Sequence, residues 1–80
     1  MDESIVKIIN TVGTLSETKK GWKKELNIIS WSQRDPKYDI REWSPDHEKM
    51  GKGSTLTFDE LIVLKDLLEQ EIARVNKEEK

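Results

Sequence analysis

The stretch that decides the fold runs from residue 38 to residue 76 and reads YDIREWSPDHEKMGKGSTLTFDELIVLKDLLEQEIARVN. Its first six residues alternate as a strand does, with Tyr38 and Ile40 on one face and Arg41 and Trp43 on the other. Its last twenty residues change to the spacing of a helix. A strand followed by a loop and a long helix predicts an α+β fold.

Residues 44–53 contain a proline and two glycines and predict a loop, which leads to a short strand at 54–56. Thr57 and Glu60 fit a capping box, in which each side chain accepts the other residue's backbone amide, so a helix is predicted over 58–76. Its apolar positions recur every three or four residues, at Leu61, Leu64, Leu68, Ile72 and Val75.

Upstream of this stretch, β-branched residues predict a first strand over 4–15, with Gly13 at a bulge. Turn residues at 19–21 precede a second strand over 22–31, and a turn at 33–36 leads to the third. The core face of the central strands is predicted to carry Leu26, Ile28, Tyr38 and Ile40. The whole pattern predicts a four-stranded antiparallel sheet followed by one C-terminal helix.

The chain is short: 80 residues, 38% of them charged and only 34% apolar, with no cysteine. This predicts one domain over 1–80, with a frayed tail at 77–80, in the cytoplasm, and no membrane span. So small a core is only marginally stable in a single chain. The apolar stripe of the helix is also wider than a single contact surface requires, although one sheet could cover all of it. We therefore expect a homodimer, whose interface residues are Leu61, Ile62, Val63, Leu64, Leu67, Leu68 and Ile72.

The sequence lacks the residues and spacings of known catalytic and metal-binding motifs. The one histidine, His47, is expected to be an exposed loop residue, and no second histidine is present to build a zinc site. The glycines around Lys52 lack the spacing of a phosphate loop. We therefore expect no enzymatic activity, no cofactor and no metal.

Charge is distributed unevenly along the chain. The net charge is −2, but residues 19–53 carry nine cations against six anions, a net +3, while residues 54–80 carry four against seven, a net −3. All three tryptophans lie in the basic segment, and cations interleaved with flat aromatic rings are typical of single-strand binding surfaces. The candidate nucleic-acid-binding residues are Trp22, Lys23, Lys24, Asn27, Trp31, Arg41, Trp43, Lys49 and Lys52. The tryptophans could instead be core residues, and for Trp22 that choice stays open.

Residues 38–43 (YDIREW) and 52–57 (KGSTLT), with the capped helix behind them, resemble the positive cofactor 4 family of single-stranded DNA-binding transcriptional coactivators. Residues 21–27 (GWKKELN) and 43–53 (WSPDHEKMGKG) resemble its bacterial YdbC branch more closely. The resemblance implies a curved sheet, a homodimer and sequence-tolerant binding of single-stranded DNA. It assigns base stacking to Trp31 and Trp43, and backbone contacts to Arg41, Lys52 and, more loosely, Lys24.

Two other functions remain open. An RNA-binding module would use the same stacking and phosphate contacts. A protein-interaction module would dock a partner on the apolar helix stripe and keep the tryptophans in the core. The family resemblance adds the transcription machinery as a partner and association with the nucleoid as a location.

Overall fold

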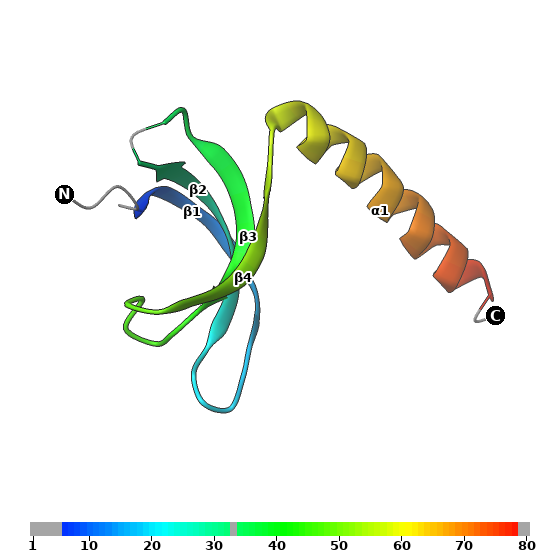
Figure 1. Ribbon diagram of the computed structural model, residues 1–80. Coiled ribbons are helices and arrows are strands. Elements are labelled where there is room, and N and C mark those ends of the chain that lie inside the picture. The colour runs from blue at the N-terminus through cyan, green and yellow to red at the C-terminus, as the bar shows by residue number, and fades with distance from the viewer. Residues whose placement is uncertain (1–5, 33, 79–80) are drawn as a thin grey trace.

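The computed structural model of the chain describes residues 6–32 and 34–78. It consists of a curved sheet from which one helix projects (Figure 1). The strands β1 (Val6–Glu17), β2 (Lys23–Trp31), β3 (Lys37–Trp43) and β4 (Met50–Leu56) are followed by the helix α1 (Phe58–Glu78). The strands pair antiparallel in the order β1-β2-β3-β4. The predicted α+β fold is confirmed.

Strand β4 is longer than the sequence predicted. It begins at Met50, which pairs with Trp43, rather than at residue 54. The glycines that suggested a loop lie inside the strand, where Gly53 pairs with Arg41. A Cβ atom at Gly53 would lie 2.3 Å from both the Arg41 Cβ and the Ile40 carbonyl oxygen. The glycine therefore allows a close approach between strands instead of marking a turn.

The structure differs slightly from the prediction at the two ends of the chain. Helix α1 continues to Glu78, two residues past the predicted end, where Arg74 forms an ion pair with the Glu78 carboxylate. Half of the predicted frayed tail is thus helical, and the other half, residues 79–80, lies outside the described residues. The first two residues of the predicted first strand, at positions 4 and 5, also lie outside them.

Strand β1 is an edge strand interrupted by three bulges. Its register against β2 shifts near residues 9, 12 and 15, and the shift before Gly13 agrees with the predicted bulge. The unpaired positions hold Ile9, Val12 and Leu15, which are all exposed. Bulges of this kind increase the twist of an edge strand and discourage pairing with another chain.

The two faces of β2 and β3 differ in burial. The face here called concave carries Glu25, Asn27, Ile29, Trp31, Asp39, Arg41 and Trp43, and its central residues Asn27, Ile29 and Asp39 are completely buried. The opposite, convex face carries Leu26, Ile28, Tyr38 and Ile40, which are only half-buried. The predicted core face is therefore the less enclosed one in the single chain, because the curved sheet encloses the concave side.

Helix α1 begins as predicted and then leaves the sheet. The Thr57 amide donates to the Glu60 carboxylate at 2.9 Å, and the Glu60 amide donates to the Thr57 hydroxyl at 3.1 Å, which confirms the capping box. Among the described residues, α1 contacts only β3 and β4, with the Phe58 ring against Tyr38 of the convex face. No described residue of α1 is buried, and no described helix is long and apolar enough to cross a membrane.

Candidate nucleic-acid interface

The strand register brings several predicted residues onto the concave face. Lys23 lies opposite Trp43, and Asn27 lies opposite Asp39. Because paired residues project to the same side of a sheet, these side chains share one face with Arg41 and Trp31, as the sequence predicted.

Arg41 is the most connected side chain of this face. Its Nε donates to both carboxylate oxygens of Asp39, at 2.9 and 3.1 Å, and its Nη1 donates to the Gly51 carbonyl at 3.2 Å. Its guanidinium also lies 4.8 Å from the centre of the Trp31 ring, which is a cation–π contact. Asp39 is fully buried and offsets the charge of Arg41. Arg41 is therefore held in place against the Trp31 ring.

A cavity of about 440 Å³ opens beside Trp31 and Arg41. Its lining residues are Trp31, Arg34, Asp35, Lys37, Arg41 and Thr55. Three of them are cations and only one is a carboxylate, so the cavity joins an aromatic ring to positive charge. Sequence reasoning did not assign Arg34 and Lys37 to the site, because they flank a turn whose position over the sheet depends on tertiary structure.

Lys24 and Lys52 belong to a second region. They line another cavity, of about 460 Å³, together with Glu42 and Gly53. Lys24 lies opposite Glu42 and alternates with Lys23, so it projects to the other side of β2 from Trp31. Arg41 borders both cavities. The structure therefore divides the predicted cations between two regions that meet at Arg41.

Trp43 and Asn27 are buried in the single chain. Trp43 is 5% exposed, and one face of its ring stacks on His47. Asn27 is completely buried, and its amide donates to Glu25. The curvature of the sheet encloses residues that strand alternation alone would leave on a surface, and direct contacts of these two side chains with nucleic acid stay predictions.

The two remaining predicted residues lie near the hairpin loops. Trp22 is half-buried beside the β1–β2 turn, where its amide donates to the Thr18 hydroxyl at 3.1 Å. Gly21 closes that turn with a φ of 91°. Lys49 is exposed at the end of the β3–β4 loop. Neither Trp22 nor Lys49 lines the cavity beside Trp31.

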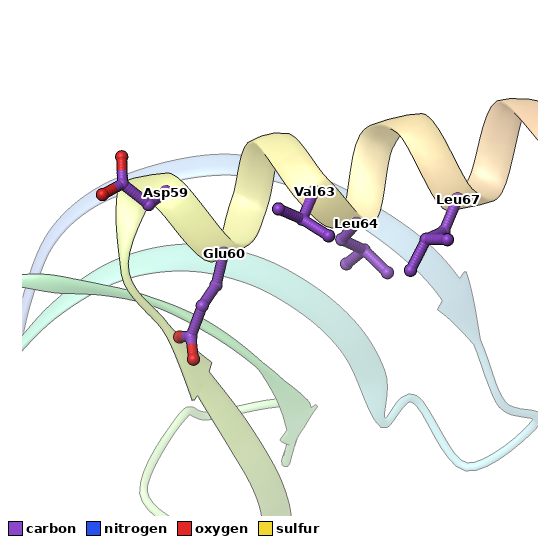
Figure 2. Close-up of a pocket in the computed structure, with 5 residues that line it drawn as sticks. All are labelled: Asp59, Glu60, Val63, Leu64 and Leu67. Carbon is purple, nitrogen blue, oxygen red and sulfur yellow. The ribbon is translucent and has the colours of Figure 1, made fainter.

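The predicted dimer residues form an exposed apolar surface on α1. Ile62, Val63, Leu67, Leu68 and Ile72 are between 45% and 58% exposed, while Leu61 and Leu64 are half-buried. Figure 2 shows Val63, Leu64 and Leu67 along one side of the helix, where with Asp59 and Glu60 they line a cavity of about 290 Å³. So large an apolar surface is typical of an interaction site.

No constellation for metal binding is present in the part of the chain that the structure describes. There, no group of three histidine, cysteine, aspartate or glutamate side chains could hold an ion. The one histidine contacts Glu25 and Trp43 instead.

Comparison with known proteins gives two matches. The family model for Transcriptional Coactivator p15 (PC4) matches residues 18–67, a range that includes β2, β3, β4 and the first half of α1. An uncharacterized protein of Treponema pallidum (strain Nichols) is 52% identical over 67 residues, which cover 84% of this chain and 79% of the relative. The family match includes every residue of both cavities beside Arg41.

Proposed function

Because this chain belongs to the Transcriptional Coactivator p15 (PC4) family, whose members bind single-stranded nucleic acid without catalysis, we propose that it is a sequence-tolerant single-stranded DNA-binding protein acting in transcription. The observation that carries the proposal is the Trp31–Arg41 pair at the edge of a cation-lined cavity. A base stacks on the indole while Arg34 and Lys37 contact phosphates.

The chemistry of this surface favours single strands over duplexes. A duplex keeps the faces of its bases stacked inside, whereas a single strand can present them to an aromatic ring. The cations contact the backbone and so carry no sequence information. We therefore expect tight binding to oligo-dT and weak dependence on sequence.

The proposed assembly is a homodimer formed through α1 and the convex face. The apolar residues of both surfaces are half-buried or exposed in the single chain, and a second copy would cover them. The acidic helix then lies away from the DNA, while the concave face meets it with the cavity that Arg34, Lys37 and Arg41 line. The transcription machinery is the proposed partner, in the cytoplasm at the nucleoid.

A titration with oligonucleotides tests the proposal. The fluorescence of the tryptophans is followed as oligo-dT, oligo-U or a duplex is added at about 50 and 200 mM salt. We expect Trp31→Ala to weaken binding by about 1–3 kcal/mol. We expect Lys37→Ala to reduce the logarithmic salt slope by about 0.7, the value for one single-strand phosphate.

Lys65→Ala is the matched control, because it also removes one cation but from the exposed, acidic helix. It should leave affinity and salt slope unchanged. Tighter binding to oligo-U than to oligo-dT would assign the site to RNA. Equal affinity of Trp31→Ala and the unsubstituted protein would refute the site.

A further inference from the structure

The loop between β3 and β4 holds His47 in one position. The Ser44 hydroxyl donates to the Asp46 carboxylate at 2.6 Å and accepts the Lys49 amide at 3.0 Å. The Asp46 carboxylate also accepts the Glu48 amide, and these two bonds keep the pKa of Asp46 below its ordinary value. The carboxylate is therefore charged at neutral pH and keeps the loop closed around His47.

The backbone of His47 is left-handed. Its φ is 60°, in the region that glycine occupies most easily and that asparagine, aspartate and histidine occupy more often than other residues do. This backbone conformation turns the loop at His47.

Two contacts fix the imidazole ring. Its Nε2 lies 3.1 Å from the nearer carboxylate oxygen of Glu25, which is 4% exposed and also accepts the Asn27 amide. One face of the ring stacks on Trp43, with the ring centres 5.5 Å apart and the planes 27° from parallel. The ring is thus held at an edge and on one face.

Part of the imidazole side chain stays accessible. The His47 side chain is 41% exposed although one face stacks on Trp43 and one edge contacts Glu25. The accessible area belongs to the parts of the side chain that these two residues leave uncovered. A fixed, partly exposed ring can stack on a base, and histidine is one of the residues that proteins use for this.

The position of this ring on the sheet would allow it to contact the same single-stranded DNA molecule that Trp31 binds. Trp31 lies at one end of β2, and Lys23, opposite Trp43, lies at the other. They are eight positions apart, which is about 26 Å along a strand. A single strand crossing the concave face from Trp31 would reach His47 at the far end, next to the cation Lys23.

We propose that His47 is a second base-stacking residue of this interface, with Trp43 behind its ring and Glu25 as its positioning residue. The proposal rests on the proposed function and extends it by naming where the far end of the strand binds. It also gives Trp43 an indirect part in binding that agrees with its burial.

Two substitutions of His47 separate stacking from a structural role. His47→Asn suits the left-handed backbone, but it has no ring and its shorter side chain does not reproduce the contact between Nε2 and Glu25. His47→Phe keeps a ring but cannot bond to Glu25. The readout is the affinity for an oligo-dT of about 12 nucleotides, with the melting temperature of each variant measured in parallel.

If His47 stacks on a base, His47→Asn binds about tenfold more weakly with little change in melting temperature, and His47→Phe keeps most of the affinity. If His47 only holds the loop, the order is reversed. Loss of affinity in both variants would assign the contact to the polar imidazole edge and overturn the stacking proposal.

Glu25→Gln tests the positioning role. We expect it to weaken binding two- to threefold in the unsubstituted protein and to have no effect in the His47→Asn variant, because its influence acts through the ring. Equal effects in both backgrounds would contradict that role. Failure of the unsubstituted protein to bind oligo-dT would refute the proposed function itself, whereas normal binding by His47→Asn would refute only this extension.

Discussion

At the scale of single residues, the proposed interface depends on how Arg41 is held. Asp39, the Gly51 carbonyl and the Trp31 ring each fix one part of its side chain. A guanidinium fixed in this way loses little further freedom when a ligand binds, so it is well suited to position the indole beside it. Gly53 leaves the space through which the Arg41 side chain passes.

Gly53→Ala should therefore displace Arg41. The new Cβ would overlap both a side-chain atom and a backbone carbonyl, and the carbonyl cannot move without distorting β3. We expect a loss of about 1–3 kcal/mol in the free energy of unfolding, measured by urea denaturation, together with weaker binding to oligo-dT.

Gly13→Ala is the control for this substitution. Gly13 also lies in a strand, but nothing lies within 4 Å of the position of a Cβ atom there. Gly13→Ala should therefore not reduce the free energy of unfolding through a steric clash of the new Cβ. A Gly53→Ala variant as stable as Gly13→Ala would show that the close approach between β3 and β4 is not required.

At the scale of elements, helix α1 depends on local interactions more than on packing. The capping box satisfies its first amides, and ion pairs join Lys65 to Glu69 and Arg74 to both Glu71 and Glu78. No described residue of α1 is buried in the single chain. A helix without tertiary burial is marginal in water, so the local pairs and a partner surface together decide its stability.

Acid should weaken the C-terminal half of α1. The hydrogen bonds that the Glu71 carboxylate accepts from Arg74 lower the pKa of Glu71 from its ordinary value of 4.5. A carboxylate whose pKa is lowered in the folded state stabilises the fold at a pH above its ordinary, unfolded-state pKa. This stabilisation is lost as the pH falls through the lowered pKa. Circular dichroism at 222 nm should therefore show helix lost below pH 4.5.

Arg74→Gln isolates this contribution from the other carboxylates. The variant should have less helix at neutral pH and a smaller change on acidification. Identical acid titrations of Arg74→Gln and the unsubstituted protein would mean that the Glu71–Arg74 pair does not stabilise the helix.

At the scale of the whole molecule, charge and apolar surface are separated. The segment with a net charge of +3 forms the turn and strands around the two cavities, whereas the segment at −3 is mostly helix. Helix α1 projects from the sheet (Figure 1). Its apolar residues are largely exposed in the single chain. A second copy that covered α1 and the convex face would leave both concave faces free for DNA.

A charged substitution on α1 tests the homodimer. The double variant Val63→Glu and Leu67→Glu places two carboxylates on the exposed apolar side and should give a monomer in sedimentation equilibrium. Lys65→Glu, on the charged side of the same helix, should leave the oligomeric state unchanged. A monomeric unsubstituted protein would contradict the proposed assembly and favour a different partner for the helix.

The sequence by itself determined the order of the elements, the helix cap, the shared face of Trp31 and Arg41, and the apolar stripe of α1. These are set by local periodicity and by side chains a few residues apart. It did not determine the length of β4, because a glycine needed for close packing resembles a glycine in a loop.

Only the tertiary structure decided how open each residue of the shared face is. Alternation along a strand gives the side to which a residue projects, but the curvature of the sheet gives its depth. That curvature buries Trp43 and Asn27, brings Arg34 and Lys37 to the cavity, and leaves the His47 side chain 41% exposed. Burial depends on contacts between segments distant in the chain, which no local pattern records.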